Sequence, residues 1–160
     1  MVANMDEDIR FDDADKAGPD EASPPLRLRT YERPEGTFVQ VEGDLDVETV
    51  ERLRSALNNA CDAAEQRPAG PSPGPYARPA VVVDLRGVGF LDSAGLALLT
   101  RTHAEHLGRC DVALLLARGS HPAYVVGLCR LGRAMPVACT PAELVTYLSL
   151  AQFPAAPLRA

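Results

Sequence analysis

Asp92 and Ser93 stand side by side in the stretch FLDSAGLALL, residues 90–99, where an apolar, strand-like run turns into a helical pattern. A serine in this position could act as a nucleophile, or it could simply cap the helix. Capping is the simplest interpretation of the spacing. Either Asp92 or Ser93 could accept a hydrogen bond from an unpaired backbone N–H of the first helical turn.

Other chemistry has less support in the sequence. A hydrolase elbow, G-x-S-x-G, would need glycine where Leu91 stands, and no histidine and acid pair has a recognisable context. Nucleotide-binding patterns of the GxxxxGK[ST] or GxGxxG type are missing as well. His103 and His106 are three residues apart and could place two metal ligands side by side, but no acid or cysteine cluster follows. We therefore expect one packing histidine and one exposed histidine.

The cysteines show no CxxC or other paired metal-ligand spacing. Reduced packing thiols are the simplest interpretation, and both disulfides and zinc are disfavoured. The four residues concerned are Cys61, Cys110, Cys129 and Cys139.

Charge is concentrated in residues 1–21, which hold eight acids against Arg10 and Lys16. Their balance of −6 equals the net charge of the whole chain, so the remainder is neutral. A neutral body argues against direct nucleic-acid binding. We expect residues 1–25 to be a disordered acidic N-terminal extension, either plainly solvated or serving as an interaction or autoinhibitory tail. This acidic start differs from a secretory signal, and no apolar run could span a membrane, so a cytoplasmic location is expected.

Hydrophobic periodicity predicts the elements that position Asp92 and Ser93. Residues 26–30 and 38–41 alternate as in an antiparallel hairpin, and a helix with Asp46 as N-cap follows, with Val47, Val50, Leu53 and Leu57 on its apolar stripe. A proline-rich insert occupies residues 65–79, where a PxxP ligand role is the weaker alternative to an inert loop.

Alternation of strands and helices continues after that insert. Residues 80–85 and 111–117 form apolar runs that are typical of strands buried on both faces. A helix is expected from Leu96 to a stop at Gly108. A second helix should run from Ser120 to Gly132 and carry Val125, Leu128 and Cys129. A short strand at 136–139 then precedes the last helix, which should run from a capping box at residues 140–143 to about residue 150. The order ββαβαβαβα indicates an α/β fold, with a mixed sheet flanked by helices.

The run VVVDLRGVGFLDSAGLALL, residues 81–99, resembles the core of the STAS domain family, in particular the bacterial anti-sigma factor antagonists. The turn Gly43-Asp44-Leu45-Asp46 is similar to the family's other recurrent motif, although aspartate stands at position 44 where glutamate is common. HPAYVVGLCRLG and the TPAEL cap are similar to its later helices. The resemblance covers residues 26–150, which we expect to form one STAS domain followed by a C-terminal tail, 151–160.

The resemblance implies a phosphorylation switch without enzymatic activity or a cofactor. Ser93 would be phosphorylated by a partner anti-sigma factor, a serine kinase that uses ATP. The unphosphorylated domain would bind this kinase and free a sigma factor, and a phosphatase would reset the switch. Ala94 stands where many relatives carry a second hydroxyl, which excludes a second phosphate there. The implied partner-binding residues are Asp44, Asp46, Asp92, Ser93, Ala94 and Gly95.

Several alternatives stay open at this point. Asp44 and Asp46 could equally be a loop terminus and a helix cap, and Gly95 could either admit a kinase loop or be tolerated without a role. The chain could instead be a STAS subunit of a stress-signalling complex or a transporter, or a small serine hydrolase using Ser93. The sequence does not decide whether the domain forms a homodimer.

Overall fold

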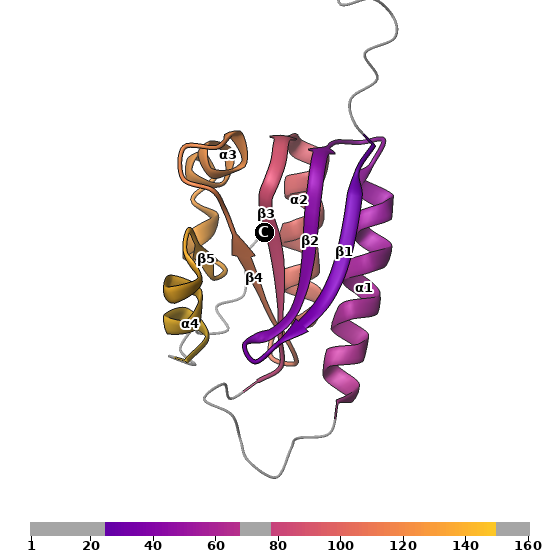
Figure 1. Ribbon diagram of the computed structural model, residues 1–160, viewed down its shortest axis with the longest axis vertical. Helices are drawn as coiled ribbons and strands as arrows, with labels where there is room; N and C mark the ends of the chain where they lie inside the picture. The colour runs from indigo at the N-terminus through magenta and orange to yellow at the C-terminus, as the bar shows by residue number, and fades with distance from the viewer. Residues whose placement is uncertain (1–24, 68–77, 150–160) are drawn as a thin grey trace, which may run out of the picture.

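The computed structural model describes residues 25–67 and 78–149 (Figure 1). Residues 1–24 of the acidic extension predicted for 1–25, most of the proline-rich insert at 65–79 and the tail at 151–160 lie outside the described residues. Within the described part the chain alternates strands and helices in the predicted order, with one short 3-10 helix added. The elements are β1 (Arg27–Arg33), β2 (Gly36–Leu45), α1 (Val50–Gln66), β3 (Ala80–Leu91), α2 (Ser93–His106), β4 (Asp111–Leu115), α3 (His121–Leu128), η2 (Leu131–Arg133), β5 (Val137–Ala138) and α4 (Pro141–Ser149).

Five strands of the described residues form one sheet in the order β1-β2-β3-β4-β5. β1 and β2 are antiparallel, whereas β2, β3, β4 and β5 are parallel neighbours. The predicted α/β class with a mixed sheet and flanking helices is confirmed. The carboxyl ends of the parallel strands meet at one edge of this sheet, called the carboxyl edge below (top of Figure 1).

A tight hairpin joins β1 to β2. Gly36 has a φ of +148°, and a Cβ on it would lie 2.4 Å from the carbonyl oxygen of Ala80 on the neighbouring strand. Glycine is required here because no side chain fits that space. The register pairs Arg33 with Gly36 and Arg27 with Glu42, so β1 begins close to the carboxyl edge.

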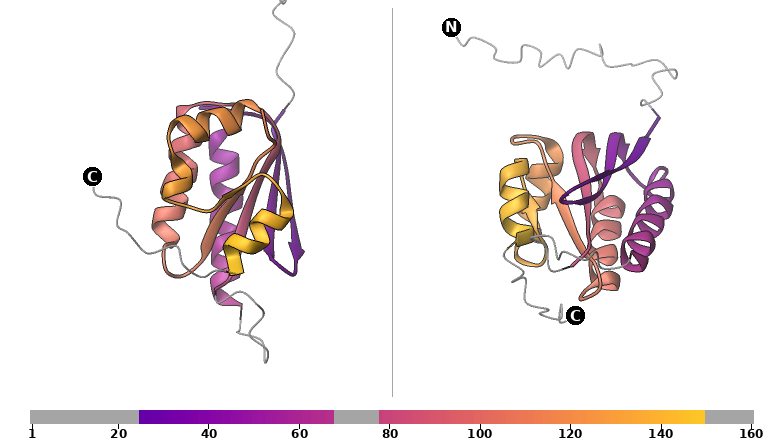
Figure 2. Two further views of the ribbon diagram at one scale, coloured as in Figure 1. Left: turned by 90° about the vertical axis from the view of Figure 1, so that its left-hand side faces the viewer. Right: turned by 60° about the horizontal axis from the view of Figure 1, so that its bottom comes forward.

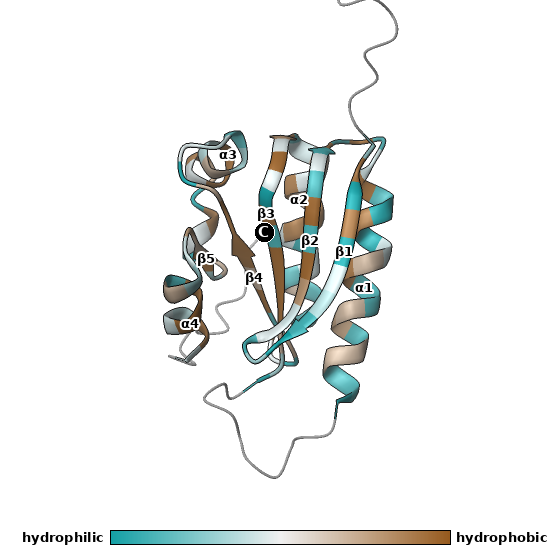
Figure 3. Ribbon diagram, in the orientation of Figure 1, coloured by the Kyte–Doolittle hydropathy of each residue, from teal (hydrophilic) through white to brown (hydrophobic). Residues whose placement is uncertain are grey.

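The helices cover the two faces of the sheet unequally. α1, α2 and α3 pack on one face, where Leu53, Leu99 and Val126 belong to the main hydrophobic core. α4 packs on the opposite face, where Leu144 and Leu148 cover a smaller cluster (left view of Figure 2). The central strands contact both layers, which explains why residues 80–85 and 112–116 are buried without alternation (brown in Figure 3).

The start of α1 differs from the prediction. α1 is assigned from Val50, and Thr49, the residue before it, makes no side-chain cap hydrogen bond. The predicted capping contacts of Asp46 are present one turn earlier: its carboxylate accepts the backbone N–H groups of Glu48 and Thr49, at 2.9 and 3.1 Å, and its carbonyl accepts the N–H of Val50 at 2.9 Å. Val47 lies in that turn and is 70% exposed, so it does not belong to the apolar stripe.

The end of α1 also moves, because the helix extends to Gln66 and takes the first two residues of the predicted insert. The apolar stripe continues through Ala60 and Ala64, and the Glu65 carboxylate contacts the imidazole of His106 and the guanidinium of Arg109. These contacts hold the last turn of α1 against α2.

Further corrections concern α3 and its neighbours. α3 ends at Leu128, and Arg130 adopts a left-handed conformation before η2, so the helix does not reach Gly132. Leu128 is 64% exposed and Cys129 is exposed, so neither is a packing residue. Cys61 and Cys110 are buried as predicted, and the hydrogen bond between their thiols raises the pKa of Cys110.

The predicted capping box of α4 gains an additional bond. Thr140 Oγ1 accepts the N–H of Glu143 at 3.1 Å, as expected. The Glu143 carboxylate accepts the N–H of Cys139 at 2.8 Å, and backbone hydrogen bonds from Cys139 and Thr140 lower the pKa of Glu143. α4 is therefore tied to the end of β5.

His103 and His106 are both 7% exposed, so the prediction of one exposed histidine is wrong. Burial lowers the pKa of His103 below its ordinary value, since the interior disfavours the imidazolium ion. Between that lowered pKa and about 6.5, the unfolded chain binds more protons than the folded one, so stability must fall as the pH falls through this window.

We therefore expect the free energy of unfolding to decrease between about pH 7 and 5.5, by at most about 1.4 kcal/mol per pH unit from this group. His103→Leu should flatten that dependence in urea titrations. Burial also raises the pKa of Asp111. Protonation of this carboxyl at lower pH raises the free energy of unfolding, so the titrations are kept above the pH range in which Asp111 is protonated. An unchanged slope in His103→Leu would contradict this origin.

Candidate functional site

The two sequence motifs meet at the carboxyl edge of the sheet. β3 is six residues longer than its predicted end at Leu85, and two register shifts against β2 carry it to Leu91. As a result Asp44 lies opposite Phe90, and Leu45 lies opposite Leu91. The backbone N–H of Asp92 then donates to the carbonyl of Leu45 at 3.1 Å. The Asp44–Asp46 turn and the Asp92–Ser93 pair are therefore direct neighbours.

Asp92 serves as the N-cap of α2 and as a link between the motifs. Its Oδ1 accepts the N–H of Gly95 at 3.0 Å, which satisfies one unpaired donor of the first helical turn. Its Oδ2 accepts the N–H of Val47 at 3.2 Å, from the turn that follows β2. Both oxygens of the carboxylate are engaged, so capping is assigned to Asp92 and not to Ser93.

Ser93 is the first residue of α2 and is exposed. No described side chain or backbone group hydrogen-bonds to its hydroxyl, which distinguishes it from Ser120, whose Oγ donates to Ala117 and caps α3. The first turn of α2 contains no acidic residue. The Ser93 hydroxyl therefore lies at the positive end of the helix dipole and is open to solvent.

The surroundings of Ser93 lack the partners of a hydrolase nucleophile. Such a serine needs a base within hydrogen-bonding distance, and none contacts Ser93 in the described part of the chain. The nearest histidine along the edge, His121, uses its Nδ1 to accept the N–H of Leu91 at 3.1 Å. Among residues 25–67 and 78–149, no group of three or more His, Cys, Asp or Glu could hold a metal ion.

The turn between β2 and α1 is built from side-chain hydrogen bonds. Thr49 Oγ1 accepts the N–H of Asp46 at 3.0 Å and donates to the carbonyl of Asp44 at 2.9 Å. The Asp46 carboxylate is used within this turn, whereas the Asp44 carboxylate lies over Gly89, where a Cβ would be 3.2 Å from its Oδ1. Asp44 and Asp46 are both half-buried. They shape the loop that flanks Ser93.

Gly95 has a different place from the one expected of a partner-binding residue. It is buried, and a Cβ on it would lie 2.6 Å from Leu91 Cδ1 and 2.9 Å from Leu45 Cγ. Its lack of a side chain lets the first turn of α2 approach β2 and β3 closely. Gly95 therefore positions Ser93 from beneath and offers no surface to a kinase loop, while Ala94 is half-buried beside it.

Gly95→Val should consequently destabilise the domain, by about 2 to 3 kcal/mol, because the branched side chain would overlap two buried leucines. Urea unfolding followed by circular dichroism measures this effect. Gly127→Val is the matched control, since a Cβ at that helical position meets no atom within 4 Å. Equal stability of the two variants would show that the space beneath α2 is not limiting.

Sequence reasoning missed an apolar flank beside Ser93. Phe90 is 45% exposed, and its ring stacks on the imidazole of His121 with centroids 4.8 Å apart. Tyr124 and Leu128, 65% and 64% exposed, continue this surface along α3, and exposed Val47 lies beyond Asp92. Phe90, Tyr124, Leu128 and Val47 form what we call the apolar flank. Spacing along α3 could have grouped Tyr124 with Leu128, but the contact between Phe90 and α3 has no sequence signal.

Comparison with known proteins concerns the family and the fold. The family model described as STAS domain matches residues 27–122, more than half of the chain. An anti-sigma factor antagonist from Mycobacterium paratuberculosis has a similar structure, with a TM-score of 0.64 and 22% identity over 79% of this chain and 98% of that one. An anti-sigma-factor antagonist (STAS) domain protein from Planctomyces limnophilus is similar with a TM-score of 0.53 and 19% identity, over 76% and 96% of the two chains. No curated protein sequence matches the chain. At these identities the structural likeness concerns the fold.

Proposed function

The chain belongs to the STAS domain family, and from this premise we propose that it is an anti-sigma factor antagonist that is switched by phosphorylation of Ser93. In its unphosphorylated form it binds an anti-sigma factor serine kinase and thereby frees a sigma factor. Phosphorylation by that kinase ends the binding, and a phosphatase restores it. The protein works in the cytoplasm as a binding switch and not as an enzyme, and it needs no cofactor of its own.

One observation carries this proposal: Ser93 is exposed and free of hydrogen bonds among the described residues because Asp92 performs the cap. A hydroxyl that capped the helix would have to give up a bond to accept phosphate. Here the phosphate can be added without breaking any bond that the described residues make.

None of the described helices is long and apolar enough to cross a membrane.

The helix start also favours a phosphate electrostatically. A phosphoserine carries about two negative charges, and at the N-terminus of α2 it would face unpaired backbone N–H groups and the positive end of the helix dipole. Asp92 adds like charge next to it, but both of its oxygens already bind backbone N–H groups. The modification should leave the domain folded, so it must act on the partner interface.

The apolar flank supplies the other part of that interface. Phe90, Tyr124, Leu128 and Val47 are large exposed hydrophobic residues on both sides of Ser93, and such patches mark protein contacts more often than inert surface. A partner that covers this flank buries apolar area and brings its own groups within a few ångströms of the Ser93 hydroxyl. Asp44, Asp46 and Ala94 border the same contact, and Gly95 supports it from inside.

A kinase assay tests the proposal directly. The full chain is incubated with ATP and candidate anti-sigma factor kinases, and phosphate is located by mass spectrometry. We expect one phosphate, on Ser93, and none on Ser93→Ala. Ser55→Ala is the matched control, because Ser55 is an exposed serine on α1 whose hydroxyl donates to Glu51. Phosphate on other residues with Ser93 unmodified would refute the proposal, and so would ester hydrolysis that is lost in Ser93→Ala.

A further inference from the structure

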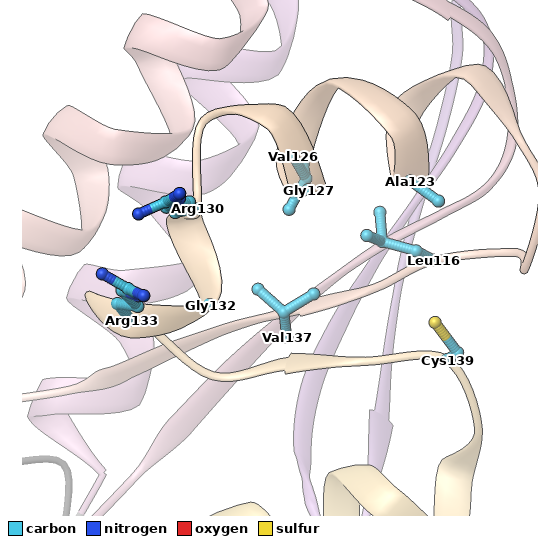
Figure 4. A pocket seen from close by; sticks show the side chains of 9 residues that line it. All are labelled: Leu116, Ala123, Val126, Gly127, Arg130, Gly132, Arg133, Val137 and Cys139. Atoms are coloured by element: carbon cyan, nitrogen blue, oxygen red, sulfur yellow. The ribbon is translucent and has the colours of Figure 1, made fainter.

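An open groove lies between α3, η2 and β5, with a volume of about 430 Å³ (Figure 4). Its floor is apolar, and two arginines, Arg130 and Arg133, stand together at one end. The remaining lining residues are Leu116, Ala123, Val126, Gly127, Gly132, Val137 and Cys139. This groove shares no lining residue with the apolar flank.

The two arginines have no ionic partner in the described part of the chain. Several other arginines there are paired, for example Arg118 with Glu143 and Arg109 with Glu65. Arg130 and Arg133 instead place two like charges near one another beside apolar surface, which is unfavourable unless an anion joins them. Arg130 is also the one described non-glycine residue with positive φ, +51°. This left-handed conformation ends α3 and directs the chain into η2, which brings Arg130 to the end of the groove beside Arg133.

We propose that this groove binds the acidic segment of the same chain around residues 5–15, MDEDIRFDDAD. That segment carries six acids, which complement Arg130 and Arg133, and it carries Met5, Ile9 and Phe11, which can occupy the apolar floor. The groove is open along its length, as an extended peptide requires. The residues beyond position 21 hold fourteen acids and fourteen arginines, so they offer no comparable excess of negative charge.

The connection is long enough. β1 begins near the carboxyl edge, and Leu116, Ala123 and Cys139 place one end of the groove at the same edge. Crossing from β1 to β5 takes four strand spacings, about 19 Å. The fourteen residues between Phe11 and Leu26 can span up to about 50 Å. Because the segment is tethered, its effective concentration is on the order of millimolar, so even weak contacts would keep it bound.

The proposal does not depend on phosphorylation of Ser93, but it has a consequence for the same edge. α3 contributes residues both to the groove and to the apolar flank. The bound segment would then lie next to the surface proposed for the kinase. Occupancy of the groove by this segment can be measured both with and without the kinase.

Paramagnetic relaxation in the full-length chain tests this binding. A nitroxide is placed on Ala14→Cys, in a background where the accessible thiols are removed by Cys129→Ser and Cys139→Ser. We expect the amide signals of Val126, Gly127, Gly132 and Val137 to be broadened most at low salt. The broadening should disappear in 1 M salt, where the Debye length is about 3 Å.

Charge variants make the experiment decisive. Arg130→Ser with Arg133→Ser should abolish the broadening, whereas the matched pair Arg27→Ser with Arg29→Ser on β1 should leave it unchanged. Uniform broadening, broadening centred on β1, or broadening that survives Arg130→Ser and Arg133→Ser would overturn the proposal. So would broadening seen only between labelled and unlabelled copies, which would indicate a second chain as the occupant. The labelled chain could show no intramolecular broadening while added laurate shifts the amide signals of the groove residues. That result would overturn the proposal and identify a small amphipathic anion as the occupant.

Discussion

Phosphorylation of Ser93 is expected to weaken binding of the anti-sigma factor kinase by about a hundredfold while leaving the domain folded. A dianion about 6 Å from one partner carboxylate, at an effective dielectric constant near 20, costs about 5 kcal/mol. Salt screening that halves this cost leaves enough for a factor of about a hundred in Kd. Isothermal titration with the phosphorylated and unphosphorylated full chain measures the effect.

Two variants separate charge from loss of the hydroxyl. Ser93→Asp carries about one charge rather than two, so its binding should fall between those of the unmodified and phosphorylated proteins. Ser93→Ala should bind about as well as the unmodified chain, because the hydroxyl makes no hydrogen bond among the described residues that the fold would lose. Helical circular dichroism should be the same in all forms. A large loss of helix on phosphorylation would show that release acts through unfolding of α2, and equal binding by Ser93→Asp and Ser93→Ala would contradict the electrostatic mechanism.

The fold and the existence of the site followed from sequence because their signals are local. Unalternating apolar runs identified the central strands, and the adjacent Asp92 and Ser93 identified a helix start. The cap itself is a local hydrogen bond between Asp92 and Gly95, but the second oxygen of that carboxylate accepts the N–H of Val47, 45 positions away, and no periodicity carries that information. The link that Asp92 makes between the two motifs is therefore a tertiary property.

Errors in the sequence predictions have a common physical origin. Helical spacing made Val47 and Leu128 appear to be core residues, yet Val47 lies in a turn closed by Asp46, and Leu128 ends a helix whose outer face is covered by no element of residues 25–67 and 78–149. Gly95 was assigned to the surface because a glycine in a first helical turn has no sequence mark of burial. Its role depends on the leucines of two strands that approach it in space.

Arg86→Met should lower the free energy of unfolding by about 3 kcal/mol, the second large effect that we expect. The carboxylate of Asp84 is 2% exposed. Alternation along β3 places it on the same sheet face as Val82, which belongs to the smaller cluster opposite α1 and α2. It accepts Nε and Nη2 of Arg86 at 2.9 and 2.8 Å, and the Arg86 backbone N–H at 3.1 Å. The hydrogen bond to Asp84 raises the pKa of Arg86, so the guanidinium stays charged. Methionine would leave the carboxylate buried with the backbone donor alone.

Urea denaturation of a matched set tests this origin. Arg101→Met removes an exposed helical arginine that has no ion pair among the described residues, and it should change stability by less than about 0.5 kcal/mol. Asp84→Leu combined with Arg86→Met should recover most of the loss, because an apolar pair of similar volume leaves no buried charge. If that double variant is no more stable than Arg86→Met, the cost comes from lost packing of the arginine stem. In either case folded Arg86→Met should still accept phosphate on Ser93, since the ion pair and the switch serine are on different parts of the sheet.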